Sequence, residues 1–185
     1  MRRGIAGTVF VHKIAGAAAE AGGTLAEVKR AAEKAASNVR SMGMAMSACT
    51  IPAVGKPGFA LGENEIELGM GIHGEPGILR TDVMRADQLA QELCGRIIAD
   101  LGGECEEAAV LVNGLGATPL MELYILYGAV EQALMARGVR IYRAYVGNYM
   151  TALEMAGASV SILRLDAELR ALLDAPANTP ALWQG

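Results

Sequence analysis

The sequence predicts an α/β fold, a two-layer sandwich of helices on a sheet, preceded by two further helices. Segments with strand-like hydrophobic patterns alternate along the chain with segments of helical period. The unbroken apolar run over residues 108–112 is typical of a buried strand. The segment 86–101 is the clearest helix, because apolar residues recur every fourth position at Leu89, Leu93, Ile97 and Leu101.

Two helices open the chain. Residues 5–21 have a helical pattern that ends at a pair of glycines, and a second helix begins at Thr24. Thr24 and Glu27 form a capping-box signature, in which the side chain of each residue accepts a hydrogen bond from the backbone N–H of the other residue. No strand precedes these helices. We therefore expect residues 1–38 to be the end of a domain that begins upstream, and residues 39–185 to form an α/β domain with an extended tail.

The next part of the chain predicts two strands separated by a long loop. Residues 39–48 alternate, with methionines at every second position that would fill a core or a subunit interface. The segment 52–62 contains prolines and glycines and predicts the loop. The second strand, over 66–72, runs into a glycine-rich turn at 71–77, where regular structure must end.

After the strand at 108–112, the segment 114–117 predicts a turn. Thr118 is expected to be the N-cap of the next helix, with Pro119 at its first helical position and its end near residue 138. A turn of this kind at a helix N-terminus can bind an anion. Two glycines between a strand and a helix are more often only a turn, and Pro119 removes one N–H donor.

The C-terminal part predicts a strand over 139–146, a short helix near 152–155 and a strand over 159–165. One or two helical turns follow over 169–173. The rest of the chain is expected to be an extended tail.

Composition narrows the function. The chain is 52% hydrophobic and 19% charged, against about 25% charged in an average domain, so we expect apolar surface that faces a partner. The net charge of −4 and the lack of a basic run disfavour nucleic-acid binding. The three cysteines form no C-x-x-C pair, which predicts reduced thiols in a cytoplasmic protein and no metal site. No apolar run reaches the roughly 18 residues of a membrane span.

Several motifs, taken together, resemble the dihydroxyacetone-binding subunit of dihydroxyacetone kinase. Their order and spacing fit over essentially the whole chain. They are R-R-G-I-A-G-T at 2–8, G-I-H-G-E-P-G at 71–77, V-N-G-L-G-A-T-P-L-M-E-L at 112–123, V-G-N-Y-M-T at 146–151 and L-D-A-P at 173–176.

The resemblance implies a transferase of glycerol metabolism whose subunit has two α/β domains and pairs as a homodimer. In this family the histidine of the G-I-H-G-E-P-G motif, here His73, binds dihydroxyacetone or a similar short keto sugar. The bond to the carbonyl carbon is a hemiaminal, and the bound ketone is phosphorylated to dihydroxyacetone phosphate. The phosphate comes from ATP with magnesium on a separate domain, or from a small ADP-carrying subunit recharged by a phosphotransferase chain. Neither donor module is found in this sequence, so we expect no cofactor in the chain itself.

One departure from the family matters. An N-terminal domain with a G-G-G-S-G-H-E-P motif and an acid–base aspartate precedes this region in the family, and this sequence contains neither. We expect a split subunit, a truncation or a fragment whose substrate pocket is incomplete alone. The alternative is a non-catalytic keto-sugar-binding or regulatory relative, or an inactive fragment.

The residues around His73 suit the implied chemistry. A hemiaminal needs a neutral imidazole, which dominates at pH 7 because the ordinary histidine pKa is about 6.5. It also needs a carbonyl, which glycerol lacks. Gly71, Gly74 and Gly77 permit positive φ and close approach of the backbone to a ligand. Glu75 either orients His73 through a hydrogen bond or, more commonly for such residues, is a solvated loop carboxylate.

A plainer interpretation is a glycine-rich turn with an incidental histidine. For the remaining candidates we favour structural roles: surface or interface packing for His12, and a buried structural thiol for Cys49.

Overall fold

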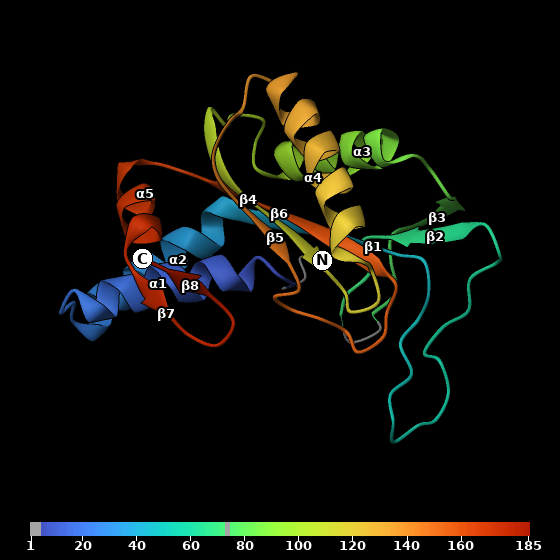
Figure 1. Cartoon of the computed structure of the whole chain (residues 1–185). Coiled ribbons are helices and arrows are strands. Elements are labelled where there is room, and N and C mark those ends of the chain that lie inside the picture. The colour runs from blue at the N-terminus through green and yellow to red at the C-terminus, as the bar shows by residue number, and fades with distance from the viewer. Residues whose placement is uncertain (1–4, 73–74) are drawn as a thin grey trace.

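The computed structural model describes residues 5–72 and 75–185. Its centre is a six-stranded mixed sheet in the order β3-β2-β1-β6-β4-β5 (Figure 1). The strands are β1 (Val39–Ala45), β2 (Glu65–Leu68), β3 (Leu79–Asp82), β4 (Glu107–Gly114), β5 (Arg140–Gly147) and β6 (Gly157–Arg164). The helices are α1 (Thr8–Glu20), α2 (Leu25–Asn38), α3 (Ala86–Asp100), α4 (Leu120–Met135) and α5 (Ala167–Asp174).

Strand directions bring several loops to one edge of the sheet. Strands β4 and β5 are parallel, and both β4 and β1 are antiparallel to β6, which lies between them. The carboxyl ends of β1, β4 and β5 and the amino end of β6 therefore share an edge. Strand β2 overlaps β1 only near this edge, where Met44 is opposite Leu68 and Ala45 is opposite Glu67.

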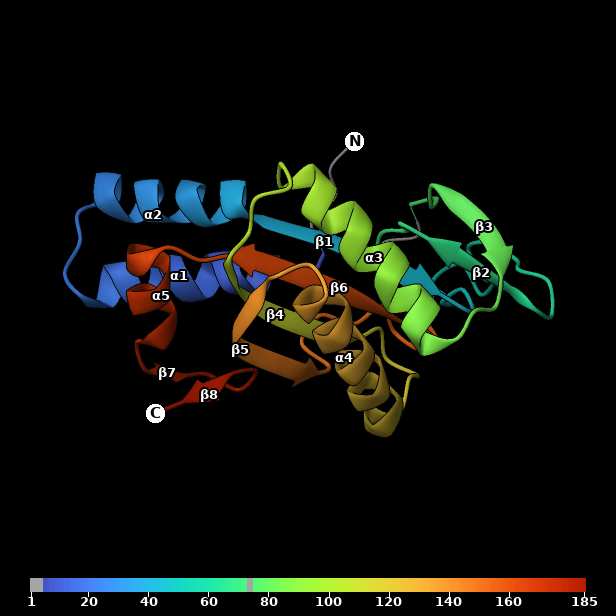
Figure 2. The same ribbon diagram turned by 90° about the horizontal axis from the view of Figure 1, so that it is seen from above.

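Helices pack against both faces of the sheet. Figure 2, seen from above, shows α1, α2 and α5 grouped at the left, apart from α3 and α4. Helices α3 and α4 and one face of the sheet form the two layers expected for residues 39–185, around a core that includes Val110 and Val112. Helices α1, α2 and α5 cover the other face, around a core that includes Ala109 and Leu111. Because the side chains of residues 108–112 enter these two cores in turn, this part of β4 has to be apolar. The α/β class is confirmed.

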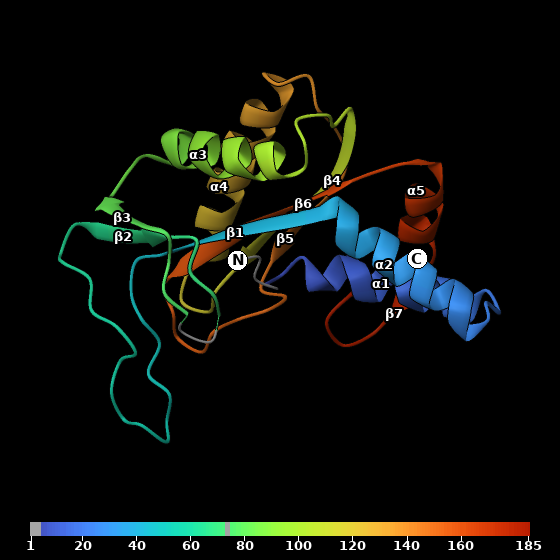
Figure 3. The same ribbon diagram turned by 180° about the vertical axis from the view of Figure 1, so that it is seen from behind.

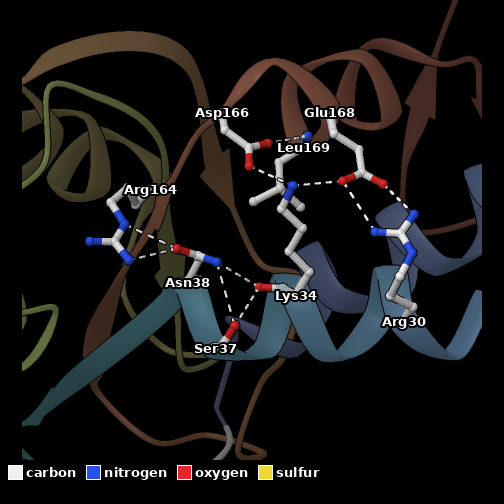
Figure 4. A network of polar contacts seen from close by, with 8 residues as sticks. All are labelled: Arg30, Lys34, Ser37, Asn38, Arg164, Asp166, Glu168 and Leu169. Atoms are coloured by element: carbon white, nitrogen blue, oxygen red, sulfur yellow. Dashed lines mark hydrogen bonds and ion pairs between the residues drawn. The ribbon is translucent and has the colours of Figure 1, made fainter.

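The termini of α2 and α5 meet in a polar network (Figure 4). Asp166 caps α5 by accepting a hydrogen bond from Leu169 N–H at 2.9 Å. At the other end of α2, the predicted capping box of Thr24 and Glu27 is confirmed. The Glu168 carboxylate accepts hydrogen bonds from Arg30 Nη2 at 2.5 Å and from Lys34 Nζ at 2.6 Å. These two cations lower the pKa of Glu168 from 4.5 to about 2.

This network predicts a pH-dependent effect of Glu168→Gln. The folded-state pKa lies below the unfolded one, so the stabilisation is fully present above pH 4.5 and is lost as the pH falls towards about 2. We expect a lower Tm than wild type at pH 7, and a difference that shrinks below pH 4.5 and closes near pH 2. The matched control Glu33→Gln removes a more exposed ion pair to Lys29 and should change Tm less. A pH-independent Tm difference for Glu168→Gln would contradict the assignment.

Some predicted boundaries were wrong. The strand expected over 66–72 ends at Leu68, because Gly69 takes a left-handed conformation with φ of 77°. Strand β3 was not predicted, since its exposed residues show no hydrophobic pattern and it is held by pairing with β2. The tail was expected to be only extended, but it forms a small hairpin of β7 (Ala177–Asn178) and β8 (Trp183–Gln184).

The other helices and strands lie close to their predicted ranges. In the part of the chain that the structure describes, none of the helices has the length and apolar character needed to cross a bilayer.

Candidate functional site

Four loops meet at the edge where β1, β4 and β5 end. They are the segments 46–62, 69–78, 115–119 and 148–156, and Figure 3 shows the long 46–62 loop extending away from the sheet. Their apolar side chains share one small core of Ala45, Cys49, Met70, Leu115, Ala152 and Met155, with Phe59 and Ile72 packed against it. The site region therefore has a small core of its own at this edge of the sheet, distinct from the two larger cores.

The glycine-rich loop after β2 is fixed at both of its ends. Gly69 N–H donates to Gly43 O at 2.7 Å, and Ile78 N–H donates to Leu68 O at 2.8 Å. Between these two ends, Gly71 N–H donates to Glu75 O at 3.2 Å. These bonds hold the residues on either side of positions 73 and 74.

His73 and Gly74 themselves lie outside the described residues. The roles predicted for them, and a hydrogen bond between Glu75 and His73, therefore stay predictions. The described neighbours do locate the loop, because Ile72 packs against the small core and Glu75 is half-buried beside Gly71.

Close approach explains the glycines on both sides of the tip. A Cβ at Gly71 would lie 2.6 Å from Cδ of Glu75, and a Cβ at Gly77 would lie 2.5 Å from Leu68 O. Positive φ, which was expected at these positions, is found at Gly69 instead. The Glu75 side chain is folded back onto Gly71. It does not extend into solvent, as a solvated loop carboxylate would.

Asn113, near the carboxyl end of β4, is a residue whose role the sequence did not reveal. It is fully buried. Its Oδ1 accepts hydrogen bonds from the N–H groups of Tyr149 and Met150, both at 2.8 Å, and its Nδ2 donates to Met150 O at 2.8 Å. One side chain thus fixes the start of the 148–156 loop to the end of β4. An amide at the end of an apolar run is the signal that could have pointed to it.

The expected N-cap role of Thr118 was wrong, because α4 begins at Leu120 with Pro119 as its N-cap. The Thr118 hydroxyl instead donates to Gly157 O at 2.7 Å and accepts from Gly157 N–H at 2.9 Å. Thr118 thereby joins the loop after β4 to the start of β6.

The loop after β4 is also bonded to its neighbours through its backbone. Leu115 N–H donates to Gly157 O and Ala117 N–H donates to Met155 O, each at 3.1 Å. These donors are not available to an anion, so the structure favours the plain turn.

The short helix predicted near 152–155 was also wrong. The segment is a turn in which Leu153 has a left-handed φ of 55°, and Gly116 pairs with Met155 in an isolated bridge. A Cβ at Gly116 would overlap the Leu153 carbonyl, and only a glycine lets the two loops approach this closely. The helix was predicted from local pattern, whereas these contacts between loops determine the conformation.

Glu67 is a second residue that the sequence did not reveal. It is 4% exposed, and its Oε1 accepts a hydrogen bond from Gly77 N–H in the glycine-rich loop. Glu65 lies two positions earlier on β2 and is also a glutamate. The sequence alone therefore does not show which of the two carboxylates is buried.

The remaining candidates have structural positions. Cys49, Cys94 and Cys105 are free and buried, as predicted for Cys49. Burial raises the pKa of the Cys94 thiol to about 11, which keeps it protonated. His12 is exposed on α1. Within residues 5–72 and 75–185, no group of His, Cys, Asp and Glu side chains could hold a metal ion.

Comparisons with known proteins agree on one family. The Dak1 domain matches residues 1–181. The dihydroxyacetone-binding subunit DhaK of a PTS-dependent dihydroxyacetone kinase of Listeria innocua is 53% identical over 170 residues, which are 90% of this chain and 51% of that subunit. The chain thus spans about half the length of such relatives.

Two solved structures share the fold. One is titled dihydroxyacetone kinase operon co-activator Dha-DhaQ, with a TM-score of 0.87 and 34% identity over 94% of this chain and 55% of that one. The other is the dihydroxyacetone kinase from C. freundii in complex with AMP-PNP and Mg²⁺. Its TM-score is 0.86, with 35% identity over 98% of this chain and 33% of that one.

Proposed function

Because the chain belongs to the Dak1 domain family, we propose that it is the half of a dihydroxyacetone kinase subunit that binds dihydroxyacetone covalently through His73. The supporting observation is the loop of residues 71–77, anchored where four loops of the site region meet. Relatives are named dihydroxyacetone-binding subunits. In this proposal residues 1–38 close the preceding domain and residues 39–185 form the substrate-binding domain.

The proposed bond forms by addition of a neutral imidazole to a ketone. A ring nitrogen of His73 attacks the carbonyl carbon with its lone pair, and the C=O π electrons move to oxygen. The other ring nitrogen then loses its proton, and through water the oxygen gains one. The product is a neutral hemiaminal in which the terminal hydroxyl is held in place for phosphoryl transfer.

The phosphoryl donor in this proposal is bound elsewhere. The C. freundii kinase structure contains AMP-PNP and Mg²⁺, and the Listeria relative is named PTS-dependent, so both donor types occur in the family. ATP, or ADP on a carrier subunit, would bind with magnesium to a separate domain or subunit. The other half of the relatives' length would supply the acid–base residues, and the assembly would work in the cytoplasm.

The carbonyl requirement gives a direct test by calorimetry. The covalent bond needs only the imidazole and its loop, so the chain alone should bind dihydroxyacetone, more weakly than a complete subunit. Glycerol has the same two terminal hydroxyls but a third hydroxyl in place of the carbonyl, and it should give no heat of binding. Equal affinity for the two compounds, or none for either, would refute the proposal.

Helix α4 presents an apolar surface beside the site that we propose contacts a second copy in a homodimer. Its exposed side chains are Leu120, Met121, Tyr124 and Ile125. We expect Met121→Ser with Ile125→Ser to raise the dimer dissociation constant by about tenfold or more, because buried apolar anchors dominate association. Light scattering over a concentration series measures it. Leu25→Ser on α2, which is also highly exposed, is the control and should have no effect. A monomeric wild type at every concentration would contradict the dimer.

The co-activator structure supports a second candidate function. In it the chain binds a keto sugar as a regulator and transfers no phosphate. Supplying the other half of the subunit and a phosphoryl donor distinguishes the two. Dihydroxyacetone phosphate should form if the kinase function is right, whereas binding without product would favour the regulator.

A further inference from the structure

Glu67 connects a buried strand to the loop that carries His73. Its Oε1 accepts the N–H of Gly77, which belongs to the returning arm of that loop, residues 75–78. The approach is so close that a Cβ at Gly77 would lie 2.5 Å from Cγ of Glu67. We propose that Glu67 is the positioning residue for His73, an inference that rests on the proposed function.

The cost of burying a carboxylate indicates a specific role. At 4% exposure Glu67 loses nearly all its hydration, which is unfavourable unless hydrogen bonds and a counter-charge replace it. Gly77 supplies the hydrogen bond at Oε1. Nη2 of Arg80 lies 3.2 Å from Oε2 and supplies the charge, although no described residue donates a well-aligned hydrogen bond to that oxygen.

Arg80 extends the connection to a second loop. Its other terminal nitrogen, Nη1, donates to Ala60 O at 3.2 Å. The carboxylate and the guanidinium together therefore tie the glycine-rich loop to both β2 and the 46–62 loop. The main-chain bonds of Gly71 and Ile78 close the loop on itself, and Glu67 adds a side-chain hydrogen bond to the returning arm at Gly77.

This arm is short, and we extend the inference along it from Gly77 to His73. Gly77 is four residues after His73, and on the other side Ile72 is held in the small core. Without Glu67, the hydrogen bond at Gly77 is lost from this arm, whereas the main-chain bonds of Gly71 and Ile78 remain. An imidazole displaced by about 1 Å loses much of its ability to react with a bound carbonyl.

Glu65 supplies a matched control on the same strand. Its Oε2 accepts the Gly62 N–H at 2.8 Å, and it therefore holds the 46–62 loop rather than the glycine-rich loop. Glu65→Ala removes a strand carboxylate and one loop hydrogen bond, as Glu67→Ala does, but leaves the Gly77 contact intact. Glu67→Gln keeps an oxygen that can accept the Gly77 N–H and removes the charge together with the ion pair to Arg80.

The experiment compares these three variants with wild type in the full chain. NMR gives the exchange rate of the Gly77 amide and the ring signals of His73, with His12 as the internal reference. Titration with dihydroxyacetone gives the half-saturating concentration. For Glu67→Ala we expect Gly77 protection to fall and half-saturation to rise, each by about tenfold or more, with a shifted or broadened His73 signal. For Glu67→Gln, Gly77 exchange and half-saturation should both stay within about threefold of wild type. Glu65→Ala should give the wild-type values of both quantities.

The outcomes separate this inference from the proposed function. If wild type fails to bind dihydroxyacetone, the proposed function is wrong, and the Gly77 exchange and His73 ring signals still decide the role of Glu67. Unchanged Gly77 exchange and His73 signals in Glu67→Ala would overturn the inference. An equal change in Glu65→Ala would also overturn it, because the effect would then be a general loosening of β2.

Discussion

Replacing His73 by alanine is expected to weaken dihydroxyacetone binding by at least about 100-fold, because the covalent bond and the orientation it provides are both lost. Alanine is small enough for the loop, and the bonds that close it involve Gly69, Gly71 and Ile78, so the fold should persist. Native mass spectrometry at increasing ketone concentration counts the chains that carry one dihydroxyacetone.

Two variants control this experiment. His73→Asn keeps a polar side chain of similar reach but has no nucleophilic ring nitrogen, so it should fail like alanine. His12→Ala removes the chain's other histidine, which is exposed on α1, and should bind as wild type does. Wild-type binding by His73→Ala would remove histidine from the mechanism.

The largest expected effect on stability comes from Asn113→Leu. Leucine has a similar size but leaves the N–H groups of Tyr149 and Met150 and the Met150 carbonyl without their buried partner. Each such loss costs about 1–3 kcal/mol, so we expect the free energy of unfolding to fall by about 3 kcal/mol or more. Urea unfolding followed by circular dichroism measures it.

Asn113→Asp tests which of the three bonds matter. A carboxylate can still accept from the two N–H groups, but it cannot donate to Met150 O and it places a charge in a fully buried position. We expect destabilisation here as well. Asn178→Leu, at an exposed position of β7, should lie within about 0.5 kcal/mol of wild type. Equal stability of the Asn113→Leu and Asn178→Leu variants would show that the three bonds contribute nothing.

Local patterns predicted the parts of the fold that local physics determines. The apolar run of β4 indicated a strand covered on both faces, and Thr24 with Glu27 marked the start of α2. Both signals depend on residues a few positions apart. For the same reason the pattern over 86–101 placed α3 almost to the residue.

Contacts between distant segments decided the rest. Thr118 has the side chain of an N-cap, but Gly157, distant in sequence, provides a better pair of hydrogen-bond partners. The segment around Leu153 has helical composition, yet its bridge to Gly116 imposes a left-handed turn. Glu65 and Glu67 look alike in the sequence, and only the return of the loop at Gly77 buries one of them. The candidate histidine, by contrast, was identified from its motif alone.

Carbon-13 NMR of the wild-type chain with dihydroxyacetone labelled at C2 tests the central claim most directly. Addition of the imidazole converts this carbon from trigonal to tetrahedral, so a new signal should appear far upfield of the free carbonyl, and unlabelled ketone should displace it. The signal should be absent with His73→Ala. A bound ketone whose C2 signal stays at the carbonyl position would contradict covalent capture and leave only ordinary binding.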